Sequence, residues 1–289
     1  MAILTRNNIV TNGLVLYLDA ANKISYPGSG TTWRNLLPYN NGSFSVAGGS
    51  SPAFLANDNI SIQFSGSSDG NQALSTGSFA SVAQYNEINI SGSDPFTIVS
   101  SFYFRNYPPQ RSYVDATNYT SLCVKNSYNP NYGLNIFYDL PSPSISGSFT
   151  RARAYGAIRN LTGTSGVTIG YGLGDVTTLT SQPLLPNNWY QIAFTQQWNP
   201  SLTRHELAIY INGVLSNSTT YTPPSVSGIS YPVNFYNTGQ VNISNPSISA
   251  GNGIYSNLNI SQNMIYNRAL SASEIQQNYN ATKTRFGLT

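Results

Sequence analysis

The chain has 289 residues, of which 40% are hydrophobic and 12% aromatic, and its formal net charge at pH 7 is +3. Charged residues make up only 8% of the chain, about a third of the usual share. This composition excludes a densely basic nucleic-acid surface and favours a protein whose surface is covered by neighbouring subunits. No run of about 20 apolar residues occurs, and the opening MAILTRNNIV does not resemble a signal peptide, so we expect neither a membrane nor nucleic acid as a partner.

Runs that are typical of β-strands alternate with turn-forming residues along most of the chain. The residues of FTIVSSFYF alternate between a strongly apolar face and a mixed face, as expected for a strand of a two-sheet sandwich. Asn212-Gly213 predicts a type I′ hairpin, because both residues tolerate a positive φ. The clearest runs, in chain order, are GLVLYLDA (13–20), SIQFSG (61–66), FTIVSSFYF (96–104), YGLNIFYDL (132–140), WYQIAFTQQW (189–198) and HELAIYINGVL (205–215).

One short helix is predicted near the end of the chain, in RALSASEIQQNYNATKTRFG (268–287). Ser271 and Glu274 have the spacing of a capping box, in which each side chain bonds the other residue's backbone N–H. Apolar residues follow at helical spacing, and Gly287 closes the segment. The pattern as a whole predicts an all-β antiparallel sandwich with one short C-terminal helix.

The strand pattern shows no linker that would divide the chain. We therefore interpret residues 1–289 as a single domain, with a loop-rich insertion at about 105–186. This segment contains long stretches rich in Gly, Pro, Ser and Asn between the strand-like runs.

Cysteine and histidine offer little material for catalysis. Cys123 is the only cysteine and His205 the only histidine, which excludes a disulfide within the chain and a cysteine-based metal cluster. We interpret Cys123 as a core or strand residue and His205 as a strand-edge residue. Arg151, Arg153 and Arg159 form the nearest approach to a basic cluster, and we interpret them as solvated residues on a loop or strand face.

Acidic residues are few and scattered. A glycosidase needs two carboxyl groups about 5–10 Å apart, and none of Glu87, Glu206 and Glu274 has another acid two to four residues away. Distant residues can still meet in the fold, but we expect no catalytic residues and a protein that is not an enzyme. The aspartates, which are equally isolated, are Asp19, Asp58, Asp69, Asp94, Asp115, Asp139 and Asp175.

No cofactor is indicated. The glycine-rich stretches YPGSGTTW (26–33) and GTSGVTIGYGLGD (163–175) lack the flanking elements of a nucleotide site, and we interpret them as turns. Asp69, Asn71 and Asp94 are of the residue types that bind Ca²⁺, but such residues also cap loops. We therefore assign no metal ligand and leave Ca²⁺ as the one ion that remains open.

Tyrosines are frequent in and beside the loop-rich segments. Exposed aromatic side chains anchor protein interfaces or stack on sugar rings. We favour burial in an interface, with glycan stacking as the alternative. The tyrosines concerned are Tyr107, Tyr113, Tyr119, Tyr128, Tyr132, Tyr155 and Tyr171.

The two ends of the chain carry a family resemblance. GLVLYLDAANKISYPGSGTTWRNLLPYNNGSF (13–44) and NLNISQNMIYNRALSASEIQQNYNATKTRFGL (257–288) resemble the opening and the closing of laminin-G-like, concanavalin-A-like domains in structural proteins of tailed phages, notably those infecting cyanobacteria. The resemblance implies a jelly-roll sandwich in which Asp19–Asn22 ends the first strand and residues 25–33 form a turn that brings the first and last strands together. The family's Phe-Asp-Gly is replaced here by Phe64-Ser65-Gly66, which removes potential calcium ligands.

The resemblance also implies a function. We expect a non-enzymatic virion protein of a tailed phage: a capsid decoration or cement protein, or otherwise a component of the tail, baseplate or fibre. Its partners would be other virion proteins, capsid or tail subunits, and further copies of itself. The alternative is a carbohydrate-binding module for host surface polysaccharide, which predicts a rim of exposed Tyr or Trp beside Asn and Asp.

Overall fold

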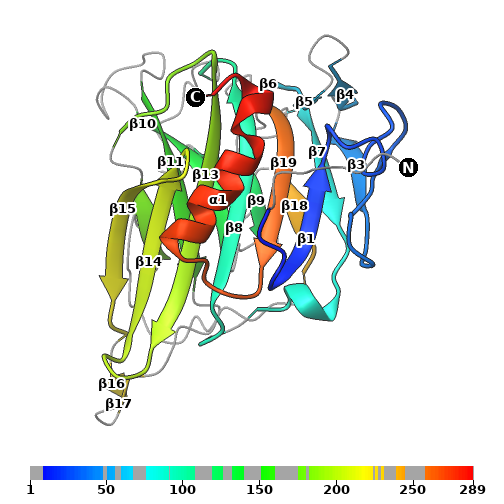
Figure 1. The fold of residues 1–289 in the computed structure, drawn as a ribbon. Helices are drawn as coiled ribbons and strands as arrows, with labels where there is room; N and C mark the ends of the chain where they lie inside the picture. The colour runs from blue at the N-terminus through cyan, green and yellow to red at the C-terminus, as the bar shows by residue number, and fades with distance from the viewer. Residues whose placement is uncertain are drawn as a thin grey trace.

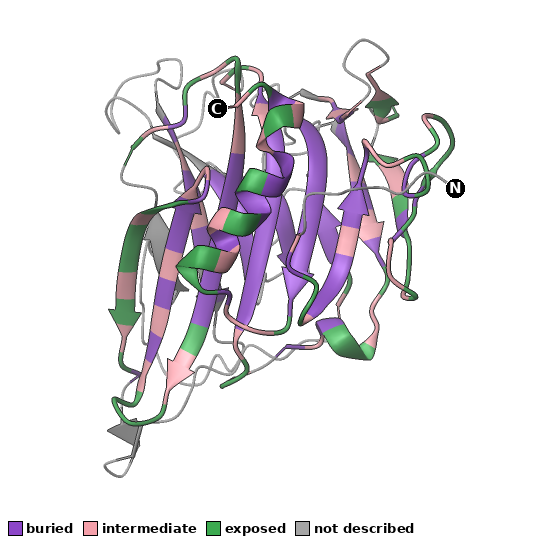
Figure 2. Cartoon of the chain, viewed as in Figure 1, coloured by how far each residue is buried: buried purple, intermediate pink, exposed green. Residues whose placement is uncertain are grey.

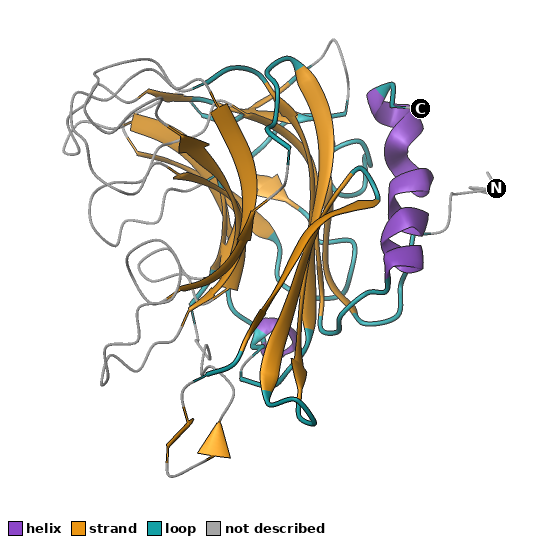
Figure 3. Cartoon of the chain, turned by 90° about the vertical axis from the view of Figure 1, so that its left-hand side faces the viewer, coloured by secondary structure: helices purple, strands orange, loops and turns teal. Residues whose placement is uncertain are grey.

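Two antiparallel β-sheets face each other, and one helix lies against the outside of one of them (Figures 1 and 3). This arrangement confirms the predicted all-β sandwich with a short C-terminal helix. The computed structural model describes residues 9–47, 51–55, 60–67, 76–90, 92–107, 119–125, 132–139, 151–159, 175–179, 182–223, 225–226, 229–230, 239–244 and 258–288.

The sheet that carries the helix, here called the helix-side sheet, has eight strands. Seven follow one another in the order β15-β14-β13-β8-β19-β5-β4, and β1 pairs with β19. The strands are β1 (Leu14–Asp19), β4 (Ala53–Phe54), β5 (Ile62–Phe64), β8 (Phe96–Phe104), β13 (Asn188–Asn199), β14 (Arg204–Ile211), β15 (Val214–Tyr221) and β19 (Leu258–Tyr266).

The other sheet, here called the curved sheet, has nine strands. It bends so that its outer face is concave (Figure 3). Its order is β12-β11-β10-β9-β18-β7-β3-β2, and β6 pairs with β7. The described parts of residues 105–186 thus contribute four strands, β9 to β12, while the division into domains stays a prediction. The strands are β2 (Thr32–Trp33), β3 (Gly42–Ala47), β6 (Gly66–Ser67), β7 (Thr76–Val82), β9 (Tyr119–Lys125), β10 (Tyr132–Asp139), β11 (Arg151–Arg159), β12 (Asp175–Leu179) and β18 (Val241–Ile243).

The main hydrophobic core fills the space between the two sheets. Phe96, Ile98, Phe102 and Phe104 of β8 all belong to it, which confirms the predicted apolar face of this strand. A short hairpin, β16 (Ser225–Val226) and β17 (Ile229–Ser230), forms a third, two-stranded sheet. Burying a large apolar side chain stabilises a fold by about 1.5–3 kcal/mol, so the phenylalanines and the aliphatic side chains of this core together stabilise the sandwich.

Helix α1 (Ala272–Thr282) packs on the outer face of the helix-side sheet over a second apolar cluster (Figure 2). The predicted capping box is present: the Ser271 hydroxyl accepts from the Glu274 N–H, and the Glu274 carboxylate accepts from the Ser271 N–H. The described residues also include the short 3₁₀ segments η2 (Asn86–Ile88) and η3 (Lys283–Phe286), the latter ended by Gly287 at φ 65°. The second cluster includes Val99, Ala193, Tyr210, Met264, Tyr266, Leu270 and Ile275.

Two local predictions are confirmed by the backbone. Asn212 and Gly213 have φ values of 50° and 80° and join β14 to β15, as a type I′ turn requires. Strand β1 ends at Asp19 and pairs along its length with the last strand, β19. The opening corner and the closing strand therefore meet, as the resemblance implied.

Candidate functional site

A polar groove lies on the outer face of the helix-side sheet, between the first turn of α1 and strands β14 and β15. Figure 1 shows where these elements lie in the fold. Its volume is about 830 Å³, and we call it the α1 groove. Hydroxyl, amide, guanidinium and carboxylate groups line it from the sheet and from the helix. The lining side chains that can hydrogen-bond are Thr195, Gln197, Arg204, Glu206, Tyr210, Ser218, Thr219, Thr220, Ser271 and Glu274.

The strand pairing explains why polar side chains gather on this face. Gln197 of β13 lies opposite Glu206 of β14, which lies opposite Thr220 of β15. Residues that are opposite each other on neighbouring strands project from the same face of a sheet. Leu207, adjacent to Glu206, points instead into the core between the sheets. The alternation of β14 thus keeps Leu207 and Ile209 inside and turns Arg204 and Glu206 toward the groove.

Glu206 is held by three neighbouring side chains. Its Oε1 accepts from Arg204 Nη2 at 3.0 Å and from Asn199 Nδ2 at 3.1 Å, and its Oε2 accepts from Gln197 Nε2 at 2.9 Å. These hydrogen bonds, with that from Gln197 the largest contribution, lower the pKa of Glu206 below its ordinary value. The carboxylate therefore stays ionised and acts as a fixed hydrogen-bond acceptor.

Glu274 supplies the acid on the opposite wall. Arg268 binds it with two parallel hydrogen bonds, Nη2 to Oε1 at 2.7 Å and Nη1 to Oε2 at 2.9 Å. This guanidinium, together with the Ser271 N–H, lowers the pKa of Glu274 to about 2. The structure thus brings Glu206 and Glu274 into one groove, although they are far apart in the sequence. Both are ionised, and neither holds a proton that it could donate.

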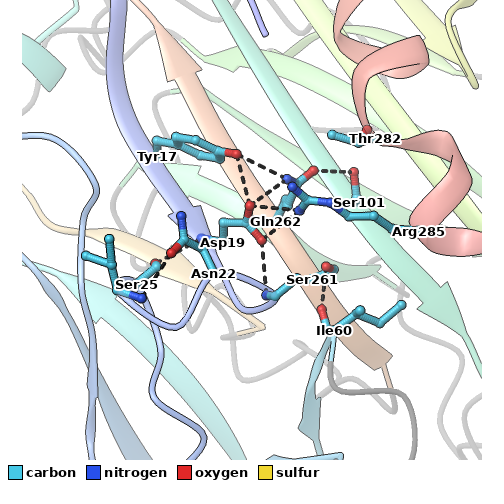
Figure 4. A network of polar contacts seen from close by, with 12 residues as sticks. Tyr17, Asp19, Asn22, Ser25, Ile60, Ser101, Ser261, Gln262, Thr282 and Arg285 are labelled. Atoms are coloured by element: carbon cyan, nitrogen blue, oxygen red, sulfur yellow. Dashed lines mark hydrogen bonds and ion pairs between the residues drawn. The ribbon is translucent and has the colours of Figure 1, made fainter. Parts of the chain in front are cut away.

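A second polar cluster fastens the two ends of the chain together (Figure 4). Asp19, only 1% exposed, accepts from Arg285 Nη1 at 2.8 Å, from the Tyr17 hydroxyl at 3.0 Å and from Gln262 Nε2 at 3.2 Å. Burial and the neighbouring Asp19 charge raise the pKa of Tyr17 well above its ordinary value, so its hydroxyl remains a donor. Asp19 belongs to the Leu-Asp-Ala-Ala-Asn corner and Arg285 to the Arg-Phe-Gly tail, the two segments that carry the family resemblance.

The aromatic residue of the same tail is also anchored. The ring of Phe286 stacks on that of Trp189 with centroids 4.7 Å apart, and Trp189 contacts Tyr103 at 5.6 Å. One face of the Trp189 ring is therefore occupied by the tail, so this cluster holds the tail on the sheet.

Cys123 and His205 lie in different sheets and do not form a catalytic pair. Cys123 is buried in β9, and burial raises the pKa of its thiol to about 12. His205 is buried in β14, where its Nδ1 lies 2.8 Å from Gln196 Nε2, and burial lowers its pKa to about 4. Both positions agree with the interpretation of these residues as parts of strands.

The three arginines of the predicted basic cluster lie on the curved sheet. Arg151, Arg153 and Arg159 are all in β11, where Arg151 lies opposite Asp139 and Arg159 opposite Asp175. These two aspartates are the only acids on the described strands of that sheet.

The possible calcium ligands are not brought together in the described part of the chain. Asp69 and Asn71 lie outside it, and Asp94 lies in the turn before β8. Within the described ranges, no group of three or more His, Cys, Asp or Glu residues could hold a metal ion. The same ranges contain no helix long and apolar enough to cross a membrane. The assignment of no metal ligand stays a prediction.

The predicted set of exposed tyrosines needs one correction. Tyr132 is 1% exposed, and its hydroxyl donates to the Ile88 carbonyl at 2.7 Å, so it belongs to the core. It is buried because β10 turns Tyr132 to the same side as Leu134 and Ile136. Tyr107 packs edge-on against Phe104. Tyr155 is half-buried on β11, Tyr119 begins β9, and the others, Tyr113, Tyr128 and Tyr171, lie outside the described residues.

Comparison with known proteins bears on the architecture. Residues 155–276 match the sequence pattern of the family described as "Concanavalin A-like lectin/glucanases superfamily". The fold is concanavalin A-like. A search among curated proteins finds no match.

Solved structures with this concanavalin A-like sandwich include binding domains and enzymes. A botulinum neurotoxin type C structure, reported with cell entry dependent on two ganglioside molecules, has a TM-score of 0.53 and 14% identity, covering 93% of this chain and 51% of that one. The binding domain of Paraclostridial Mosquitocidal Protein 1 has a TM-score of 0.53 and 18% identity, and the match covers 96% of this chain and 55% of that one. Trypanosoma rangeli sialidase in complex with sialic acid has a TM-score of 0.55 and 14% identity, and the match covers 96% of this chain and 34% of that one. The chain thus spans between a third and about half of these longer chains.

The sialidases overturn the expectation that the chain is not an enzyme. At 14% identity the likeness shows the fold alone, but that fold is found in enzyme chains as well as in binding domains. The expectation rested on the spacing of acids along the sequence. The α1 groove shows the weakness of this reasoning, because Glu206 and Glu274 line one surface without being neighbours in the chain.

Proposed function

We propose that the chain binds carbohydrate through the α1 groove. The observation that carries this proposal is the mixed set of donors and acceptors on both walls: amide, hydroxyl and guanidinium groups beside two ionised carboxylates. Sugar hydroxyls both donate and accept hydrogen bonds, so a mixed set suits them better than a wall of one kind.

The fixed positions of the two carboxylates also support the proposal. Glu206 is fixed by Gln197, Asn199 and Arg204, and Glu274 is fixed by Arg268. Acceptors that are held in place before a ligand arrives lose little conformational entropy on binding. The similarity to chains crystallised with sialic acid, or studied for their interaction with gangliosides, is consistent with a glycan ligand.

A glycan-array screen of the purified chain, with and without Ca²⁺, tests the proposal. We expect reproducible binding that is lost when Gln197→Ala and Glu206→Gln are introduced into the groove. Glu87→Gln is the matched control, because Glu87 is exposed in η2, away from the lining residues. Silence across the array, or binding that survives both groove variants, would contradict carbohydrate binding at this surface.

A second proposal concerns where the domain works. The domain is part of a tailed-phage virion, as a capsid decoration or cement protein or as a component of the tail, baseplate or fibre. The resemblance at the two ends of the chain supports this, and the Asp19–Arg285 pair gives both segments one shared structural role. The low content of charged residues is also consistent with a surface covered by neighbouring subunits.

Immunogold electron microscopy of purified particles tests the second proposal, using antibodies raised against the chain. Labelled capsids would support decoration, and labelled tails would support a role at the host surface, especially together with glycan binding. Particles that carry no label on either part would contradict a virion location.

A further inference from the structure

A second hollow lies on the other side of α1, between the corner that follows β1 and the end of the helix. Its volume is about 770 Å³, and we call it the corner groove. Half of its lining residues are apolar, a larger share than in the α1 groove. The apolar contributions come from Ile9, Leu14, Ala21, Ile24, Leu36, Leu37 and Ala281, and the polar ones from Thr11, Tyr17, Asp19, Asn22, Lys23, Thr282 and Arg285.

Arg285 lies at the polar end of this lining. Both of its hydrogen bonds to Asp19 are made by Nη1, at 2.8 and 3.0 Å, so the carboxylate does not engage Nε or Nη2. The Arg285 side chain remains 31% exposed, whereas Asp19 is buried beneath it. A guanidinium presents its donors as a planar fork, which suits a carboxylate ligand.

The charge around the groove also favours an anion. Lys23 and Arg285 line it with two positive charges, and Asp19 contributes one negative charge. The ammonium of Lys23 lies 4.9 Å from the centre of the Phe54 ring, without a carboxylate partner among the described salt bridges. The groove therefore combines an apolar wall with a net positive charge at its edge.

We propose that the corner groove binds the C-terminal residue of a partner polypeptide whose last side chain is apolar. The terminal carboxylate bonds to Arg285, and the side chain packs against Leu36, Leu37 and Ile24. An acidic sugar carries the same carboxylate, but its ring hydroxyls would lose their hydrogen bonds to water against an apolar wall. Capture of a chain terminus is a known mode of peptide recognition. This inference does not depend on carbohydrate binding in the α1 groove.

Isothermal titration of the full chain with a matched pair of probes tests the proposal. N-acetyl-L-leucine presents an apolar side chain beside a carboxylate, and N-acetyl-L-leucinamide differs only in that charge. We expect the acid to bind about tenfold or more tightly than the amide, because one charge-assisted hydrogen-bonding contact is lost. Equal binding of the two, or binding of neither, would overturn the proposal.

Two variants locate the binding without disturbing the fold. Ile24 is 69% exposed, so Ile24→Glu adds a negative charge at the edge of the groove and should abolish binding of N-acetyl-L-leucine. Leu202→Glu is the matched control, because Leu202 is 52% exposed on the turn between β13 and β14, and binding should be unchanged. Binding that persists in Ile24→Glu would refute this location. N-acetylneuraminic acid, an acidic sugar, is the last probe. If it binds and N-acetyl-L-leucine does not, the proposal that the groove binds a polypeptide C-terminus is refuted.

Discussion

Asn263 and Ser100 are fully buried in the core between the two sheets, on neighbouring strands and in register. Neither the amide of Asn263 nor the hydroxyl of Ser100 has a hydrogen-bond partner. A buried polar group without a partner costs about 1–3 kcal/mol of stability. These two residues are therefore a weak point in the core.

We expect Asn263→Leu to raise the free energy of unfolding by about 1–3 kcal/mol, because leucine has the same branching and no polar atom to desolvate. Urea denaturation measures the change. Asn280→Leu, at an exposed position of α1, is the control and should leave stability nearly unchanged. A clear loss of stability in Asn263→Leu would mean that the core needs this amide.

His205 should make the free energy of unfolding depend on pH between about pH 6.5 and 4. Its folded-state pKa is lowered to about 4 by burial, so between about 6.5 and 4 the unfolded chain binds a proton that the folded chain does not. Stability is thus complete above about pH 6.5 and falls by on the order of 2–3 kcal/mol as the pH drops to about 4. Because His205 is the only histidine, His205→Gln should flatten this part of the profile in denaturation experiments at several pH values. An unchanged slope would show that another group titrates there.

Strands β11 and β13 approach each other closely across the core at Gly156 and Phe194. A Cβ atom placed on Gly156 of β11 would lie 2.2 Å from the ring of Phe194 in β13, closer than any real contact. The glycine therefore lets the curved sheet approach the aromatic layer of the helix-side sheet.

Gly156→Ala should lower the free energy of unfolding by about 1–3 kcal/mol through overpacking. Adding Phe194→Leu should cost less in this background than in the wild-type chain, because a smaller side chain relieves the clash. A double-mutant cycle by chemical denaturation measures the coupling. Strictly additive effects would show that the two side chains do not compete for space.

For the whole molecule, the ion pair of Asp19 and Arg285 joins β1 to the tail that follows α1. We expect Arg285→Gln to destabilise the protein by about 3 kcal/mol or more, because it leaves the buried carboxylate without a compensating charge. Adding Asp19→Asn removes that charge and should recover part of the loss. Thermal or urea unfolding measures the stability of the single and the double variant. A double variant less stable than Arg285→Gln would show that the unpaired Asp19 charge is not the cause of the loss.

The sequence alone predicts those parts of the fold whose signal is local. The alternation in FTIVSSFYF, the Asn212-Gly213 turn and the Ser271–Glu274 capping box all appear in the structure as expected. Strand β11, RARAYGAIR, gives almost no hydrophobic signal, because its inward positions include Ala154 and Gly156, small residues required by the opposing aromatic rings.

The grooves depend on contacts between distant residues and could not be predicted in the same way. Glu206 and Glu274 share a surface only because α1 folds back over the sheet. The family resemblance indicated that the two chain ends meet. The residues around Asp19 and around Arg285, however, contain no pattern that predicts their ion pair. Composition and spacing describe neighbours along the chain, whereas both grooves are built from segments that are neighbours only in space.

The position of β19 has a consequence for synthesis. This strand lies between β8 and β5 and also pairs with β1, yet it ends at residue 266 of 289. Before β19 has been made, β8, β5 and β1 lack the strand that joins them, so the helix-side sheet has a gap at its centre. We therefore expect this sheet to remain incomplete in the nascent chain, and dependent on chaperones, until residue 266 has been translated.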